Sequence, residues 1–149
     1  TGITFNGDFS GDVLNQCLKL NNMIINRTHN KGTMVRITNA VKCFPPKNKP
    51  LKNEINNCLS HLSKEFLLMK NLKIIVALGR LAHDSILKSY NIPLTKYKFV
   101  HGFCHKLKSK IIMIDSYHCS KININTKKLT VKMLSMIFTL AKKLSKKDD

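Results

Sequence analysis

Apolar residues recur along the chain in two patterns, one with the period of a helix and one typical of buried strands. Apolar side chains spaced three or four residues apart predict helices over residues 10–20, 51–70, 80–90 and from about 129 onward. Runs rich in Val, Ile and other apolar residues predict strands over residues 33–43, 72–79, 98–107 and 108–118. Strands that alternate with helices predict an α/β domain with a largely parallel sheet between helical layers. Since we find no internal repeat or linker, we expect residues 1–149 to form a single domain.

Polar residues stand where the predicted strands end. Asn39 and Cys43 end one strand, Gly79 ends the next, and His118 follows a strand that ends at about Ser116. In sheets of this kind, binding sites gather at the carboxyl ends of the strands. The pattern therefore predicts one shared site. At the start of the first helix, Ser10 is the candidate N-cap.

The charge of the chain is strongly positive, with 26 Lys and Arg against 8 Asp and Glu and a formal net charge of +18. Phosphate polyanions attract such a field, so we expect a nucleic acid as the partner. The alternative explanation of the positive charge is a codon bias toward Lys, Asn and Ile, with some lysines as solvated surface residues that bind nothing. No apolar run approaches the roughly 18 residues that a membrane-spanning helix needs.

The five cysteines form an odd number and no Cys-x-x-Cys pair. This usage, without an export signal, favours a reducing compartment over a disulfide framework. Some of the thiols are expected to be small buried hydrophobic groups. Cys43 and Cys58 are candidates for more than that.

His118 is the first candidate for chemistry, in a polar loop that also holds Ser120, Asn123 and Asn125. An imidazole there can donate a hydrogen bond to charge that develops on a leaving group, while Ser120 and the loop amides hold a phosphate. The ordinary alternative is a histidine in a surface loop.

Three further residues have both a functional and a structural interpretation. Phe5 could stack on a nucleic-acid base or act as a hydrophobic staple on the first helix. Asn39 could read one edge of a pyrimidine through its donor and acceptor, or be a satisfied buried amide. Asp8 could take part in catalysis or favour the helix N-terminus, as Asp12 would.

Taken together, these segments resemble a known family in order and spacing. The stretches "TGITFNGDFSGDVL", "ITNAVKCFPPKNKPLKNEINNC", "IIVALGRLAHDSIL" and "SYHCSKININTKKLTVKML" are similar to uracil-DNA glycosylases of the family 5 type. The resemblance covers nearly the whole chain. It implies a three-layer α/β/α sandwich with a central, mostly parallel sheet of the four-stranded type.

The resemblance also implies a metal cofactor. In families 4 and 5, the cysteines that match Cys43 and Cys58 are two of the four thiolate ligands of a [4Fe–4S] cluster. The two other ligands are expected upstream of Thr1. The "CFPPKNKP" turn and the following helix would wrap the cluster and present Lys47 and Lys49 to DNA.

The implied reaction is the removal of uracil from DNA. Uracil is flipped out of the duplex into a pocket, at a cost of a few kcal/mol. Phe5 would stack on the base, Asn39 would read its edge, and His118 would stabilise the uracil anion as the N-glycosidic bond breaks. Asp8 is a candidate for positioning the water, although we favour its role in helix capping.

The sequence departs from the family pattern in three places. The glycine- and proline-containing first motif is expected before Thr1, so we expect this chain to be part of a longer protein. Cys119 stands where the family usually has Pro, which predicts a more mobile His118 loop. Asn39 stands where many members have Ala, which predicts narrower selectivity for uracil.

Two functions follow from these observations. The first is a monomeric DNA repair glycosylase that acts on uracil in DNA, in the cytoplasm or nucleoid of a bacterium or in an organellar matrix. The second is a catalytically impaired nucleic-acid-binding module of the same fold. Uracil release from a duplex separates the two.

Overall fold

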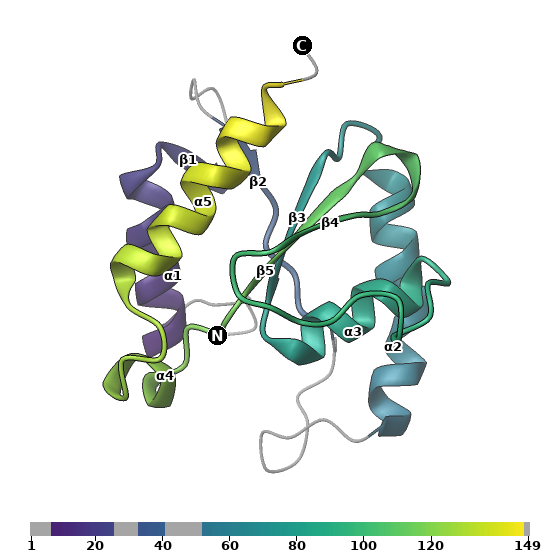
Figure 1. Cartoon of the computed structure of the whole chain (residues 1–149), viewed down its shortest axis with the longest axis horizontal. Helices are drawn as coiled ribbons and strands as arrows, with labels where there is room; N and C mark the ends of the chain where they lie inside the picture. Colours follow the sequence, from purple (N-terminus) through teal and green to yellow (C-terminus); the bar gives the residue numbers. More distant parts are fainter. Residues whose placement is uncertain (1–6, 26–32, 41–51, 148–149) are drawn as a thin grey trace. The chain divides into compact units, whose positions relative to one another are not determined.

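The computed structural model describes residues 7–25, 33–40 and 52–147, which belong to two compact units (Figure 1). The first unit comprises Thr1–Thr38 and Ser116–Asp149, and the second comprises Asn39–Asp115. In the described residues, no helix is both long enough and apolar enough to cross a membrane.

Two long helices form the framework of the first unit, together with a short parallel pair of strands. Its elements are α1 (Phe9–Leu20), β1 (Met23–Ile25), β2 (Thr33–Val35), α4 (Lys121–Asn125) and α5 (Val131–Ser145). The α1 and α5 helices pack side by side and run in the same direction, because Cys17 contacts Val131 and Asn21 contacts Ser135. The buried faces of both helices follow the predicted apolar stripes.

The second unit is built on a three-stranded sheet with helices packed against it. Its elements are α2 (Lys52–Leu68), β3 (Ile74–Leu78), α3 (Arg80–Ser89), β4 (Cys104–Lys106), the 3₁₀ turn η2 (Lys108–Lys110) and β5 (Ile112–Ser116). The strand order is β3-β5-β4, with β5 in the centre. A central strand is covered on both faces, and β5 is accordingly buried along nearly its whole length.

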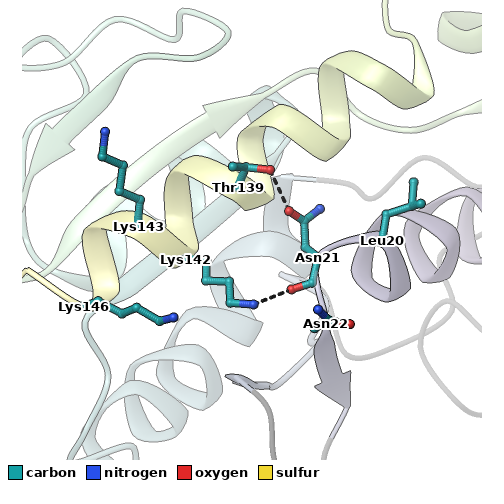
Figure 2. Close-up of a pocket in the computed structure, with 7 residues that line it drawn as sticks. All are labelled: Leu20, Asn21, Asn22, Thr139, Lys142, Lys143 and Lys146. Atoms are coloured by element: carbon teal, nitrogen blue, oxygen red, sulfur yellow. Dashed lines mark hydrogen bonds between the residues drawn. The ribbon is translucent and has the colours of Figure 1, made fainter.

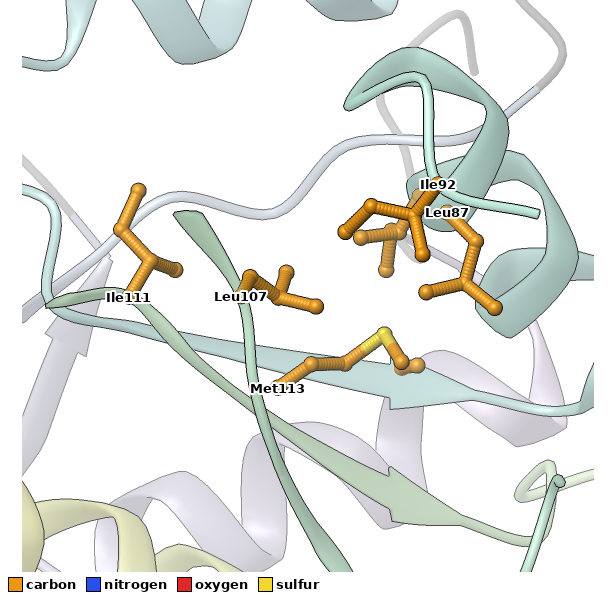
Figure 3. Packing of buried hydrophobic residues seen from close by; sticks show 7 residues of the cluster. Leu87, Ile92, Leu107, Ile111 and Met113 are labelled. Atoms are coloured by element: carbon orange, nitrogen blue, oxygen red, sulfur yellow. The ribbon is translucent and has the colours of Figure 1, made fainter. Parts of the chain in front are cut away.

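The core of the second unit joins α3 to the sheet. Figure 3 shows the Met113 side chain of β5 extending toward Leu87 of α3 and Ile92. Leu107 and Ile111, which flank the turn between β4 and β5, complete the labelled cluster. Side chains of this size contribute about 1.5–3 kcal/mol each when fully buried, so this cluster fixes α3 on the sheet.

The predicted α/β class is confirmed, with differences in detail. The β4 strand pairs with β5 in an antiparallel register, Cys104 opposite Ile114, whereas a mostly parallel sheet was expected. Only the residues from Leu107 to Ile111 join the two strands, and a parallel connection needs about a dozen residues or more. The layer arrangement and the single domain stay predictions.

The predicted strand over residues 33–43 is wrong in its extent. The β2 strand pairs in parallel with β1, Met23 opposite Thr33 and Ile25 opposite Val35, and ends there. The described residues 36–40, which follow β2, have no strand assignment. Asn39 therefore lies after this strand and not on it.

Candidate active site

Asp8 begins the α1 helix. Its backbone is extended, and its side-chain Oδ1 accepts a hydrogen bond from the amide of Gly11 at 2.6 Å. The carbonyl of Asp8 accepts the first helical hydrogen bond, from the amide of Asp12 at 3.0 Å. The capping role that we favoured for Asp8 is therefore confirmed. Ser10, the predicted N-cap, lies inside the helix instead.

Some of the contacts that hold the His118 segment come from residues nearby in the sequence. The β5 strand ends at Ser116, as predicted, and Asn123 Nδ2 donates to the carbonyl of His118 at 2.9 Å. The hydroxyl of Ser120 accepts a hydrogen bond from the amide of Asn123 at 3.3 Å and caps α4. The prediction of an irregular polar loop is thus wrong over 121–125, where Ser120 nucleates a helical turn.

Two opposite influences act on the His118 imidazole. Burial disfavours the charged form and lowers the pKa of His118 from its ordinary value of 6.5, and this is the larger influence. The negative charge of Asp8 raises the same pKa. Two of the predicted catalytic residues therefore interact within one unit. At neutral pH the balance favours a neutral imidazole, which can donate one hydrogen bond.

Cys119 fastens the His118 segment to the first turn of α1. Its side chain is fully buried, and its thiol donates to the carbonyl of Ser10 at 3.5 Å. Burial raises the pKa of the Cys119 thiol to about 11, with smaller contributions from Cys17 and Asp8, and a backbone hydrogen bond opposes the rise. The thiol thus stays neutral, and its burial and hydrogen bond restrain the His118 segment. The prediction of a mobile loop did not take this restraint into account.

The sequence of the chain was compared with those of known proteins. The sequence model described as "Uracil DNA glycosylase superfamily" matches residues 1–142. The chain belongs to this superfamily. A type-5 uracil-DNA glycosylase of Thermus thermophilus is 32% identical over 150 residues, which cover 97% of this chain and 68% of the relative.

Further relatives agree with this assignment. A type-5 uracil-DNA glycosylase of Pyrobaculum aerophilum is 37% identical over 95% of this chain and 63% of its own length. One from Mycobacterium leprae is 36% identical over 97% of this chain and 67% of its own length. The resemblance inferred from the sequence is therefore confirmed. The chain spans about two thirds of the length of these superfamily members.

Among the described residues, only some of the predicted site residues lie in the same unit. Phe5 and Cys43 lie outside the described residues. Asn39 is exposed, and it belongs to a different unit from His118. Cys58 is buried in α2, with 7% of its surface exposed. The pocket for the base and the cluster site therefore stay predictions, whereas Asp8, His118, Ser120 and Asn123 are described residues of the first unit.

A basic pocket of about 360 Å³ lies in the same unit, at the carboxyl ends of α1 and α5 (Figure 2). Lys142 Nζ donates to the carbonyl of Asn21 at 2.8 Å, and Thr139 donates to the Asn21 side-chain oxygen at 2.6 Å. Lys143 and Lys146 complete its basic wall. Lysines are favourable there because helix carboxyl ends carry partial negative charge. The pocket therefore lies where two helices end, and it is at the opposite end of α1 from Asp8.

Proposed function

We propose that this protein removes uracil from DNA by hydrolysing its N-glycosidic bond and leaves an abasic site. The observation that carries the proposal is the His118 segment, fastened to the first turn of α1 with Asp8 beside it. Membership of the superfamily and the names of its type-5 relatives support the same activity.

His118 is the proposed donor to the leaving group. As the bond between the base and the sugar breaks, the electron pair moves onto uracil and negative charge grows on its oxygens. A neutral imidazole aimed at that oxygen stabilises the charge without having to deliver a proton fully. Burial, which lowers the pKa of His118, keeps the imidazole in this neutral form.

Asp8 has two proposed roles, one at the helix and one in the reaction. One of its oxygens caps α1, and its charge acts on His118. A carboxylate also favours the positive charge that develops on the sugar in the transition state. Positioning of the attacking water by Asp8 stays part of the proposal.

The remaining site residues have proposed binding or positioning roles. Phe5 would stack on the base and Asn39 would read its edge. The Ser120 oxygen accepts in the α4 cap, so its hydroxyl proton is the group that would donate to a DNA phosphate. Asn123 would hold the His118 backbone, and through it the imidazole.

A [4Fe–4S] cluster is the proposed cofactor. In the described residues, Cys58 offers a buried thiol on α2, and no group of three metal-binding side chains includes a cysteine. Cys58 fits one ligand position, Cys43 would supply a second, and two would come from outside this sequence. When bound, the cluster would cross-link the segments that carry its thiolates.

The proposed partner is uracil-containing DNA, bound by a monomer. The net charge of +18 supplies long-range attraction to phosphate. We expect the protein to act where DNA is repaired, in a bacterial cytoplasm or nucleoid or in an organellar matrix.

The test is uracil release from a duplex that carries a single uracil, under single-turnover conditions. We expect His118→Ala to slow release by about 100-fold or more, the usual contribution of a positioned proton donor. His61→Ala, which changes an exposed histidine on α2, is the matched control and should match the unmodified protein. Salt-dependent DNA binding with no release of uracil by the cluster-loaded protein would instead support the nucleic-acid-binding module.

A further inference from the structure

Three side chains of types that bind metal ions meet in the interior of the second unit. None of them has a role in the proposed uracil site. His83, His105 and Asp115 are 1%, 3% and 0% exposed, and their ligand atoms lie within 4.8 Å of one another. His83 Nδ1 lies 2.7 Å from Asp115 Oδ1, and His105 Nε2 lies 2.7 Å from Asp115 Oδ2. Each of these contacts is an ion pair when its histidine is protonated.

Three regular elements fix the geometry of this group. His83 lies in the first turn of α3, where its amide donates to the carbonyl of Gly79 at 3.1 Å. His105 lies on β4 opposite Met113, and Asp115 follows two residues after Met113 on β5. Residues two apart on a strand share a face, so His105 and Asp115 project to the same side of the sheet.

The hydrogen bonds set a minimum for the number of protons within the group. The carbonyl of Tyr97 can only accept, so His83 Nε2, at 3.1 Å from it, carries a proton. One proton lies between His83 and Asp115, and another lies between His105 and Asp115. The buried Nδ1 of His105 has no hydrogen-bond partner.

We propose that His83 Nδ1, His105 Nε2 and the Asp115 carboxylate bind a divalent transition-metal ion, with Zn²⁺ as the best fit. Imidazole and carboxylate are its usual ligands, and three protein ligands with one open position form a common zinc site. A buried carboxylate needs a cation, and in this group a metal ion competes with protons for that position.

The surroundings have the features that orient metal ligands. His83 donates its other ring N–H to the carbonyl of Tyr97, so Nδ1, which faces Asp115, is its ligand atom. The amide of Val100 donates to Asp115 Oδ2 at 3.1 Å and supports the carboxylate. The ring centroids of Tyr97 and Phe103 lie 4.9 and 5.0 Å from that of His105, so both rings pack against it.

Binding has a defined proton balance. His83 keeps the proton on Nε2, His105 moves its proton to Nδ1, and the carboxylate holds none. At least one proton is therefore released for each metal ion bound. The two 2.7 Å contacts open to about 3.3 Å, the separation of ligands around an ion with bonds of about 2.0–2.1 Å.

The experiment is a titration of the metal-free, reduced protein with Co²⁺ and with Zn²⁺. We expect one ion per chain, a visible Co²⁺ absorption without a thiolate charge-transfer band, and release of at least one proton, measured calorimetrically in two buffers. X-ray absorption of the zinc form should show nitrogen and oxygen ligands and no sulfur. No binding at one equivalent, or a shell that contains sulfur, overturns the proposal.

Two variants and two controls locate the site. Asp115→Asn and His105→Gln keep the size of each side chain and should weaken binding at least tenfold. Asp84→Asn, on the same helix as His83, and His61→Gln should bind as the unmodified protein does. Equal affinity in Asp115→Asn and the controls contradicts the site. If the buried variants fail to fold, the ligand shell and proton count of the unmodified protein decide the question.

Discussion

Substitution of Asn123 tests whether its side chain positions His118 or whether the residue serves only the cap of α4. Its side-chain Nδ2 donates to the carbonyl of His118 at 2.9 Å, within the turn that Ser120 caps. Alanine removes this donor. Aspartate keeps the size of the side chain but presents only acceptors to a carbonyl that is itself an acceptor.

The expected magnitudes follow from this single hydrogen bond. A neutral intramolecular hydrogen bond contributes about 0.5–1.5 kcal/mol, so Asn123→Ala should slow uracil release by about 2- to 10-fold if the loss falls on the transition state. Asn123→Asp should be slower than Asn123→Ala, because the carbonyl then faces a negative charge. An acidic residue in the first turn of a helix is favourable by about 0.3–1 kcal/mol, so α4 itself should not weaken.

The assay is single-turnover release of uracil from a duplex, with thermal unfolding measured in parallel. Asn125→Ala and Asn125→Asp, exposed changes on the same helix, are the matched controls and should leave the rate unchanged. The reasoning is refuted if Asn123→Asp releases uracil as fast as the unmodified protein, or if the Asn125 variants lose as much activity.

Three further predictions concern charge, reactivity and packing. Asp8→Asn still caps α1, but it removes the charge that raises the pKa of His118, so the acid limb of the pH–rate profile should move to lower pH; no movement or a rise would contradict this. The Cys119 thiol, with its pKa raised to about 11, should resist alkylation at pH 8 in the folded protein, as measured by mass spectrometry of its peptide; rapid labelling would contradict its burial. Leu87→Ala should lower the free energy of unfolding by about 2–5 kcal/mol in urea titrations, whereas Leu94→Ala, with Leu94 41% exposed, should change it by less than about 0.5 kcal/mol.

The long helices could be predicted from the sequence because each carries a sustained apolar stripe. The α4 helix could not, since five residues are too few to show a period and it depends on the Ser120 cap. The antiparallel pairing of β4 with β5 was missed for a different reason. The residues 98–118 were interpreted as two long strands, and the short turn from Leu107 to Ile111 was not recognised.

The candidate site was predictable as far as it is local in the sequence. His118 and Ser120 stand two residues apart, and the family resemblance pointed to both. The fastening of Cys119 to Ser10 joins residues 109 positions apart, which no pattern along the chain reveals. Asp115 did carry a signal, because a carboxylate within the apolar run "IIMIDS" needs a buried partner. The identity of His83 and His105 as its partners required the fold.

The lowered pKa of His118 opposes the effect that the phosphates of the proposed DNA substrate would have on the imidazole. DNA phosphates are negative, so a bound duplex stabilises an imidazolium and raises the pKa of a nearby histidine. Burial acts in the opposite direction and lowers the pKa of His118. Because kcat/KM reports the free enzyme and kcat reports the complex, the acid limb of kcat should lie at higher pH than that of kcat/KM. Raising the salt concentration should bring the two limbs together, and limbs that coincide at low salt would show that the phosphates do not act on His118.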